Sequence, residues 1–376
     1  MLKELIQREN ISSYISGDAY VVSKNAFYYC YSLESVRFDN CVKIDDEAFA
    51  TCPQLISASF PKCIIMGSSA FQNTSLAYAN FPECVIIGES AFSSCFSLSS
   101  VSFPKCKKIK AYAFMSRNSL TEIDFPECLD IRMSAFANCS HITSISFGKC
   151  TNVDTGAFQS CYLLNSIYLP VCVFVSTGAF RECSALTSID LPELKMINGY
   201  SAFEHCSSLT SFYASKCQRI GSFAFYGCTK LSDVRISNAL YVGDDAFDGC
   251  LSLSTIDLPL CSGIGSRAFA TCASLVNVNA PLCGRIYSNA FTGCSNLSTA
   301  SFPNCYRIES GAFASCSSLM SLYLMAPNVV DLYSATAFSR SPLYSGPGKI
   351  YVPSSLYSEY LTTGYWYTFS SILTPL

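Results

Sequence analysis

Apolar residues recur along the chain with a period close to 22 residues, and the dipeptide Ala-Phe marks each recurrence. Successive Phe positions lie 22 residues apart, except for gaps of 21 before Phe92, 23 before Phe203 and 25 before Phe338. A fixed period in this range predicts a solenoid, in which each repeat is one coil that buries its apolar side against its neighbours. The fifteen Phe positions are Phe27, Phe49, Phe71, Phe92, Phe114, Phe136, Phe158, Phe180, Phe203, Phe225, Phe247, Phe269, Phe291, Phe313 and Phe338.

Each Ala-Phe is followed by a second apolar group that predicts a short strand. A Leu comes six residues after the Phe, and further apolar residues follow three and five positions later, as in Leu98, Val101 and Phe103. Because alternate residues of a strand share a side, the last two apolar residues point into the coil. Pro usually follows, as at Pro104, and ends the strand because it lacks an amide donor. The return limb then carries a fourth apolar residue, such as Ile109, and the next Ala-Phe.

These coils are expected to stack so that their strands pair in parallel, at about 4.8 Å per strand. The Phe fills the coil centre, so that Phe-to-Ala should cost roughly 3–5 kcal/mol. The Ala lies where the return limb approaches the next coil, so a larger residue there should lower the free energy of unfolding by roughly 1–3 kcal/mol. An uncovered solenoid end would leave apolar surface in water. We therefore expect an N-terminal cap over residues 1–18, about 14 coils over 19–338 and a C-terminal cap over 339–376.

Composition narrows the classes of function. Half of the residues are hydrophobic, only 14% are charged, and the formal net charge is −3. This charge gives no field that would attract nucleic acid or an acidic membrane. No stretch approaches the roughly 18 apolar residues of a membrane span, so we expect no membrane insertion. The first ten residues lack the apolar region of a secretory signal.

The 23 cysteines all occupy repeat positions, in two series. Side chains of one series point the same way, which is poor disulfide geometry, so we expect buried thiols that act as small hydrophobes. Thr74, Arg117 and Leu194 interrupt the series without a partner change, which also argues against obligatory disulfide pairing. A chain with this many free thiols fits a reducing cytosol or an anaerobic habitat. The first series, three residues after the Phe, is Cys30, Cys52, Cys95, Cys139, Cys161, Cys183, Cys206, Cys228, Cys250, Cys272, Cys294 and Cys316. The second series, just past the Pro, is Cys41, Cys63, Cys84, Cys106, Cys128, Cys150, Cys172, Cys217, Cys261, Cys283 and Cys305.

Units such as Ala-Phe-x-x-Cys-x-x-Leu-x-x-Ile-x-x-Pro-x-Cys-x-x-Ile resemble the BspA-like, or Treponema-type, leucine-rich repeats from about Ala19 to Phe338. The resemblance implies a fold of the α/β-type repeat-solenoid class. This is a right-handed leucine-rich-repeat superhelix with a parallel strand face, short strands and irregular or short helical return limbs. The segment from Lys349 to Leu361, followed by Trp366, is similar to the closing segment seen after such repeats in gut-bacterial proteins.

Members of this family are mostly surface proteins of anaerobic bacteria and some protozoa, and they are associated with adhesion. The resemblance therefore implies a monomeric, non-enzymatic binding or adhesion protein, at the cell surface or outside the cell, with a protein or glycan partner. Similar arrays occur in prophage regions, so the alternative is a structural or phage tail- or fibre-associated recognition component. The family offers no catalytic motif and no cofactor.

In a repeat fold the strand face is an extended surface suited to binding. The residue between the second and third strand apolars points outward, and most of these residues are Ser or Asn. Tyr and Arg are common at the centres of interfaces, which makes the middle of this stripe a candidate ligand-binding site. The alternative is that these are solvated strand residues. The candidates, on five adjacent strands, are Tyr168, Asp190, Tyr213, Arg235 and Asp257.

A second candidate is the basic segment that holds Lys105, Lys107, Lys108 and Lys110. These lysines could attract an anionic polymer, although lysines at a turn more often form a solvated edge.

The chemistry of an enzyme is not expected. The chain has no glycine-rich phosphate loop, no His-Glu-x-x-His and no Gly-x-Ser-x-Gly. The two histidines are isolated and no Cys-x-x-Cys pair occurs, so we expect neither a catalytic nor a metal site. The acidic pairs Asp45-Asp46 and Asp244-Asp245 precede Ala-Phe and are interpreted as turn residues, because a calcium site would need further oxygen ligands nearby.

Overall fold

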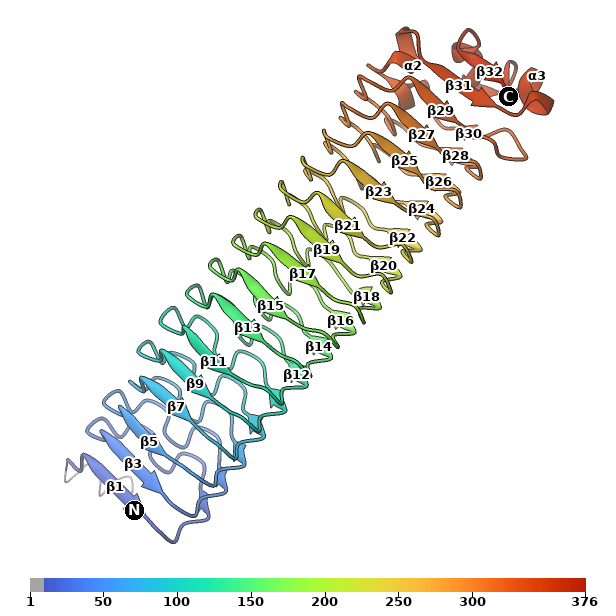
Figure 1. Cartoon of the computed structure of the whole chain (residues 1–376). Helices are drawn as coiled ribbons and strands as arrows, with labels where there is room; N and C mark the ends of the chain where they lie inside the picture. The colour runs from blue at the N-terminus through green and yellow to red at the C-terminus, as the bar shows by residue number, and fades with distance from the viewer. Residues whose placement is uncertain (1–9) are drawn as a thin grey trace. The chain divides into compact units, whose positions relative to one another are not determined.

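The computed structural model describes residues 10–376, which fall into two compact units divided in the sequence between Leu186 and Thr187. In each unit the chain winds through successive coils, and neighbouring coils pair through parallel strands (Figure 1). The described residues make about 16 turns with few helices, which confirms the predicted solenoid fold.

One limb of each coil is a short strand, called here a face strand, that lies beside the face strand of the next coil in its sheet. From β3 to β29 these strands lie in the predicted Leu-x-x-Ile-x-Leu segments. In the first unit they are β1 (Ser13–Ser16), β3 (Ser35–Phe38), β5 (Ser57–Ser59), β7 (Tyr78–Asn80), β9 (Ser100–Ser102), β11 (Glu122–Asp124), β13 (Ser144–Ser146) and β15 (Ser166–Tyr168). In the second unit they are β17 (Ser188–Asp190), β19 (Ser211–Tyr213), β21 (Asp233–Arg235), β23 (Thr255–Asp257), β25 (Asn277–Asn279), β27 (Thr299–Ser301) and β29 (Ser321–Tyr323).

Burial alternates along the face strands. In β15, Ile167 is buried between the exposed Ser166 and Tyr168. The parallel register sets Ile167 beside Ile145 and Tyr168 beside Ser146, so the same side chains align from coil to coil. The middle residue of such a strand therefore joins the core, whereas its first and last residues face solvent.

The return limb carries a second set of strands, called here return strands, of two residues each. The family resemblance implies irregular or short helical limbs here, whereas each limb holds a two-residue strand. Such a strand is too short to show alternation in the sequence. In the first unit they are β2 (Val21–Val22), β4 (Lys43–Ile44), β6 (Ile65–Met66), β8 (Ile86–Ile87), β10 (Lys108–Ile109), β12 (Asp130–Ile131), β14 (Asn152–Val153) and β16 (Phe174–Val175). In the second unit they are β18 (Met196–Ile197), β20 (Arg219–Ile220), β22 (Tyr241–Val242), β24 (Gly263–Ile264), β26 (Arg285–Ile286), β28 (Arg307–Ile308) and β30 (Asp331–Leu332).

The Ala-Phe dipeptide lies in the tightest part of the return limb. In a middle coil Ala157 and Phe158 are fully buried, and the Phe158 amide donates to the Ala179 carbonyl of the next coil at 2.8 Å. Two residues before and after the Phe, Gly156 and Ser160 have φ angles of 60° and 57°, so a left-handed residue turns the chain on each side. The Phe158 ring stacks on the equivalent ring of the preceding coil, with ring centroids 5.4 Å apart. The dipeptide thus forms both a backbone and an aromatic contact between coils.

All 23 cysteines lie within residues 10–376, and all are buried thiols. In the first series the thiol donates to the Phe carbonyl of the preceding coil, as from Cys161 to Phe136 at 3.2 Å. In the second series it donates to the carbonyl two residues further on, as from Cys172 to Phe174 at 3.4 Å. The cysteines are therefore hydrogen-bonded core residues, in addition to filling space as small hydrophobes.

Residues 1–9, half of the predicted N-terminal cap, lie outside the described residues. The rest of that segment holds β1, which pairs in parallel with β3. The ring of Tyr14 in β1 lies 5.2 Å from that of Phe27 and 5.6 Å from that of Phe38. The boundary of the cap at residue 18 stays a prediction.

Residues 339–376 follow the last coil, which ends in η1 (Ala335–Phe338). Trp366 donates through Nε1 to the Val330 carbonyl at 2.7 Å, and the Tyr360 hydroxyl accepts from the Val330 amide at 3.1 Å. The Phe369 ring lies 5.2 Å from that of Phe338. Buried aromatic residues thus cover the last coil, while the boundary at residue 339 stays a prediction. The elements here are α2 (Pro342–Ser345), β31 (Lys349–Val352), η2 (Ser354–Leu356), α3 (Tyr357–Tyr360), η3 (Gly364–Phe369) and β32 (Leu373–Pro375).

Candidate functional site

The five side chains predicted to form a binding centre all end face strands. Tyr168 ends β15 in the first unit, with 59% of its surface exposed. In the second unit, Asp190, Tyr213, Arg235 and Asp257 end β17, β19, β21 and β23. Of these four, Tyr213 is half-buried and the others are exposed. The structure therefore places all five at the surface, and their role in binding stays a prediction.

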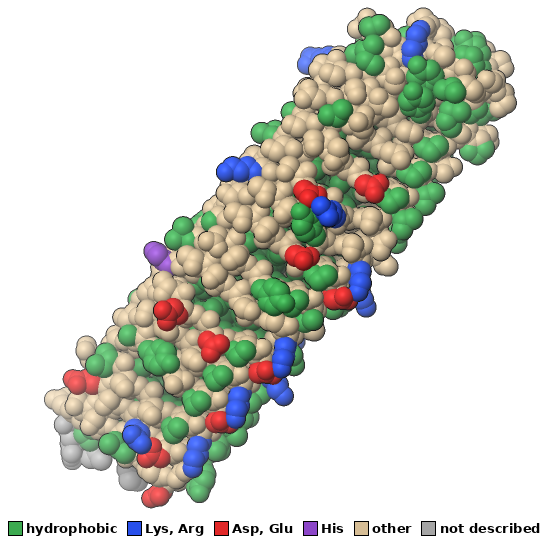
Figure 2. Space-filling view, viewed as in Figure 1, with side chains coloured by type: hydrophobic (Ala, Val, Ile, Leu, Met, Phe, Trp, Pro, Cys, Tyr) green, Lys and Arg blue, Asp and Glu red, His purple; other side chains and the backbone are tan. Residues whose placement is uncertain are grey.

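The register brings three of the five onto neighbouring strands. Asp190 lies beside Tyr213, and Tyr213 lies beside Arg235. Asp257 ends β23, which is the first strand of another sheet, and lies beside Asn279. Tyr168 in the first unit lies beside Ser146. Figure 2 shows hydrophobic side chains dispersed over this face, and acidic and basic side chains next to one another in several places. Tyr213 thus has a charged neighbour on each side within its sheet.

The strands β19 and β21 hold a three-residue group, the Tyr213–Asp233–Arg235 cluster. The Tyr213 hydroxyl donates to Oδ2 of Asp233 at 2.7 Å. Arg235 donates to the same carboxylate through Nε at 3.3 Å and Nη2 at 3.2 Å. The Arg235 guanidinium also lies over the Tyr213 ring, 4.6 Å from its centroid, which adds a cation–π contact. Each member of the cluster therefore contacts the other two.

The charges of the cluster are fixed near neutral pH. The hydrogen bond from Tyr213, followed by that from Arg235, lowers the pKa of Asp233. The hydrogen bond to Asp233 raises the pKa of Arg235. An ionised carboxylate and a permanently charged guanidinium are poor proton-transfer groups at neutral pH, so the cluster is suited to binding. The exposed Arg235 keeps further N–H groups that can donate to a partner.

Asp233 is the residue that sequence reasoning missed. The predicted stripe used only the last residue of each face strand, whereas the first residue points to the same side. Asp233 and Arg235 are the first and last residues of β21, two positions apart. The alternation of a strand would have placed both on the surface, but their hydrogen bonds required the register with Tyr213.

The basic segment lies at a charge-balanced edge of the first unit. Lys105 donates to both oxygens of Glu83 in the preceding coil, at 2.7 and 2.6 Å, and Lys108 lies 3.5 Å from Asp130 in the next. Lys149 likewise pairs with Glu127 in the preceding coil, at 2.6 Å. Basic and acidic side chains accordingly lie next to one another along one edge (Figure 2). These contacts favour a solvated edge over a site for an anionic polymer.

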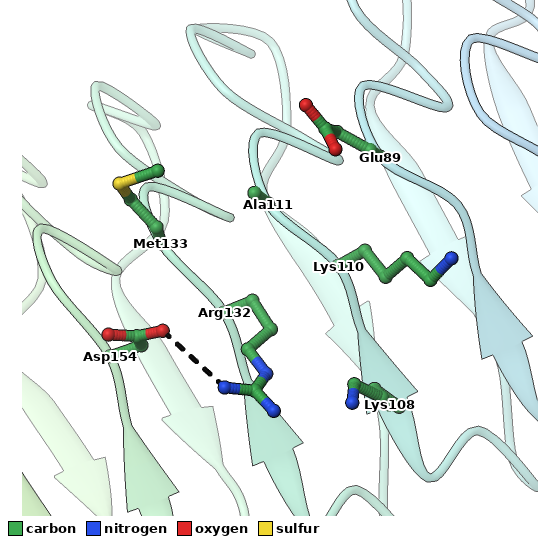
Figure 3. Close-up of a pocket in the computed structure, with 7 residues that line it drawn as sticks. All are labelled: Glu89, Lys108, Lys110, Ala111, Arg132, Met133 and Asp154. Atoms are coloured by element: carbon green, nitrogen blue, oxygen red, sulfur yellow. Dashed lines mark ion pairs between the residues drawn. The ribbon is translucent and has the colours of Figure 1, made fainter.

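A shallow pocket of about 350 Å³ lies beside this edge (Figure 3). Its Arg132 lies 2.8 Å from Asp130 and 3.8 Å from Asp154. Because Asp130 of its own coil and Asp154 of the next coil already face Arg132, the charge of this arginine is largely balanced by carboxylates. The residues that line it are Glu89, Lys108, Lys110, Ala111, Arg132, Met133 and Asp154.

The acidic pairs lie at the turns before Ala-Phe, and one aspartate of each pair joins its coil to the next. Asp46 accepts a hydrogen bond from the Ser68 amide at 2.7 Å, and Asp244 accepts one from the Ser266 amide at 2.8 Å. Within residues 10–376 no group of three or more His, Cys, Asp or Glu side chains is arranged to hold a metal ion. Over the same residues, every helix is too short or too polar to span a membrane.

Comparison with known proteins identifies the repeat. The family described as "BspA type Leucine rich repeat region (6 copies)" matches residues 12–95, 64–174, 172–261 and 240–358. No curated protein matches the chain.

Two solved structures are similar to this chain. The chain is similar to a leucine-rich repeat protein from Bacteroides ovatus, with 23% identity and a TM-score of 0.52 over 76% of this chain and 82% of that one. It also matches a leucine rich cell surface protein from Faecalibacterium prausnitzii, with 21% identity and a TM-score of 0.41 over 88% and 91% of the two chains. The likeness to the Bacteroides protein supports the solenoid fold.

Proposed function

Because this chain belongs to the BspA-type leucine-rich repeat family, we propose that it is a non-enzymatic binding or adhesion protein that presents its face strands to a protein or glycan partner. Tyr168, Asp190, Tyr213, Arg235 and Asp257 are the proposed contact residues, with Asp233 added. We include a location at the cell surface or outside the cell in this proposal, because the family resemblance implies it.

The observation that carries the proposal is the Tyr213–Asp233–Arg235 cluster. Tyr and Arg are enriched among the residues that contribute most to binding at interfaces. Hydrogen bonds within the cluster hold both side chains in place before a partner arrives. Side chains that are already ordered lose less conformational entropy on binding, so their contacts give more affinity.

A binding assay on immobilised host matrix proteins and mucins tests the proposal. Wild-type protein should be retained by at least one of these surfaces. Tyr213→Ala and Arg235→Ala should each weaken that retention by about tenfold or more, because loss of a central interface side chain costs about 1–2 kcal/mol or more. Tyr168→Ala tests in parallel whether the first unit contributes.

Tyr306→Ala is the matched control, since Tyr306 is 61% exposed and follows Cys305 on the return limb, away from the face strands. It should bind as wild type does. Equal retention of the wild type, Tyr213→Ala and Arg235→Ala would remove the proposed site, and failure of the wild type on every surface would count against these partners. Unfolding midpoints of the variants should match that of the wild type, so that a change in retention reports binding.

A further inference from the structure

The coil at the start of the second unit departs from the 22-residue period. The gap from Phe180 to Phe203 is 23 residues, and the additional residue falls between β18 and the next Ala-Phe. Its effect is visible in the strand pairing. Strand β18 pairs with β20 at Met196 and Arg219 only, whereas β20 pairs with β22 at two positions, as the neighbouring return strands do.

A pocket of about 240 Å³ lies at this irregular coil, at the ends of β18, β20 and β22. It is built entirely from the second unit. The residues that line it are Asn198, Gly199, Tyr200, Arg219, Ile220, Gly221, Ser222, Tyr241 and Gly243.

Three glycines at equivalent positions form bare backbone in this pocket. Gly199, Gly221 and Gly243 each lie four residues before the Phe of their coil. A Cβ on Gly221 would lie 2.1 Å from the Gly199 carbonyl oxygen, and one on Gly243 would lie 2.6 Å from the Ser222 nitrogen. No side chain fits at Gly221 and Gly243 because the backbone of the preceding coil lies against them, so the glycines contribute only backbone atoms to the pocket lining.

Arg219 is the one charged side chain that lines the pocket. It is exposed, and among residues 10–376 no ion pair involves its guanidinium. Two other arginines occupy the same position of a return strand, and both are paired with carboxylates. Arg285 pairs with Glu309, and Arg307 pairs with Asp331 at 3.0 Å. Arg219 therefore gives the pocket a positive charge, whereas at the equivalent positions a paired carboxylate balances the charge of the arginine.

Two tyrosines supply the aromatic part of the lining. Tyr241 lies beside Arg219 in the strand register and is half-buried. Its ring lies against Gly263, since a Cβ on that glycine would be 3.3 Å from the ring. Burial raises the pKa of Tyr241, so its hydroxyl stays a neutral donor. Tyr200 lies in the lengthened segment and is 61% exposed, so its ring can cover a ligand from the outside.

We infer that this pocket binds an acidic monosaccharide, a single sugar ring that carries a carboxylate. The Tyr200 and Tyr241 rings offer apolar faces to the C–H face of a sugar, while Asn198, Ser222 and the glycine backbone offer partners for its hydroxyls. The Arg219 guanidinium matches a carboxylate in geometry and in charge. One arginine balances one negative charge, which favours a carboxylate over a phosphate dianion. A pocket smaller than the usual range for drug-sized ligands fits one ring.

This inference does not depend on the proposed function, because the pocket lies on the return strands and the Tyr213–Asp233–Arg235 cluster lies on the face strands. The two are separable by mutation. Tyr213→Ala should leave binding of a sugar acid unchanged.

Titration calorimetry with D-glucuronate, N-acetylneuraminate and D-glucose tests the inference on the full chain. At least one of the two acids should bind with a Kd on the order of 1 mM. Glucose has the ring of glucuronate without its charge, and it should bind at least tenfold more weakly. The acid that binds more tightly distinguishes a uronic acid from a sialic acid as the source of the carboxylate.

Arg219→Gln should weaken binding of that acid at least tenfold, and Tyr200→Ala should weaken it as well. Arg307→Gln removes an arginine from the same repeat position outside the pocket and should bind as wild type does. Unfolding midpoints of the three variants verify that each is folded. No binding of either acid at tenfold the expected Kd, equal binding of glucose, or equal binding by Arg219→Gln and wild type would each overturn the inference.

Discussion

The thiol of Cys161 donates to the carbonyl of Phe136 in the preceding coil, 3.2 Å away. That carbonyl also accepts from the Cys139 amide of its own coil at 3.2 Å, so the thiol is a second donor to an acceptor with two lone pairs. Thr74 and Ser341 also lie three residues after a Phe, but their hydroxyls donate to the Phe carbonyls of their own coils. At this position the thiol of cysteine therefore adds a hydrogen bond to the preceding coil, which gives cysteine a structural role without reference to redox chemistry.

Arg117 is the exception in the first series. Its side chain is only 3% exposed, its Nε donates to the Met115 carbonyl at 2.8 Å, and its Nη1 is buried with no hydrogen-bond partner among residues 10–376. Burial lowers the pKa of Arg117. A buried donor without a partner costs about 1–3 kcal/mol. Arg117→Cys would remove that donor and restore the pattern of the series, so it should raise the free energy of unfolding by about 1–3 kcal/mol.

Urea denaturation of Arg117→Cys beside the wild type measures this change. Cys139→Arg, one coil further on, is the converse variant and should lower the midpoint, because it places a second unpaired guanidinium in the core. A lower midpoint for Arg117→Cys would show that the arginine is stabilising through contacts such as its position over the Phe96 ring, 5.1 Å from the centroid.

At the scale of one element, the coil depends on how closely the return limbs approach one another. A Cβ placed on Gly88 would lie 2.1 Å from the Gly67 carbonyl oxygen, which is backbone that cannot move aside. Gly88→Ala should therefore force two coils apart and destabilise the first unit by about 1–3 kcal/mol or more. The control is Gly148→Ala, because a Cβ on Gly148 has no atom within 4 Å. Equal thermal midpoints for the two variants would contradict the close packing of the return limbs.

Much of the coil follows from its period alone. The spacing of Ala-Phe, Leu, Ile and Pro predicts the face strands, and the structure has them at those positions from β3 to β29. The return strands could not be predicted, because two residues such as Arg219 and Ile220 carry no measurable alternation. Asp233 was missed as part of the candidate site, because its contacts arise between coils, through the register of β19 and β21. The pocket at Arg219 depends on one additional residue, whose spatial effect the sequence does not specify.

At the scale of the whole molecule, the many buried thiols predict a marked dependence of stability on pH. Burial raises the pKa of Cys139, Cys172 and Cys316 to about 12. In the unfolded chain a thiol titrates near 8.5. Below about pH 8.5 the thiols are protonated in both the folded and the unfolded chain, so the full free energy of unfolding is present and does not change with their titration. Between about 8.5 and 12 the unfolded chain releases protons that the folded chain retains, so stability falls with rising pH.

Each such thiol should remove about 1.4 kcal/mol of stability per pH unit in this window. The urea midpoint should therefore stay level between about pH 6 and 8 and fall steeply above about pH 9. Alkylation of the thiols by iodoacetamide at pH 9 serves as the control, since it should be slow in the folded protein and fast after unfolding. A midpoint that stays level through pH 10.5 would contradict the burial of these thiols.

The central claim is that the repeated side chains form a packed interior. Titration of the thiols with a chromogenic disulfide reagent tests it most directly. The titration is done at pH 8 without reductant, in the presence and in the absence of 6 M guanidinium chloride. The chain has 23 cysteines, all buried as thiols. We predict essentially no reaction in the folded protein and reaction of all 23 after unfolding. Rapid reaction of several thiols in the folded protein, or fewer than 23 after unfolding because some had formed disulfides, would contradict the account.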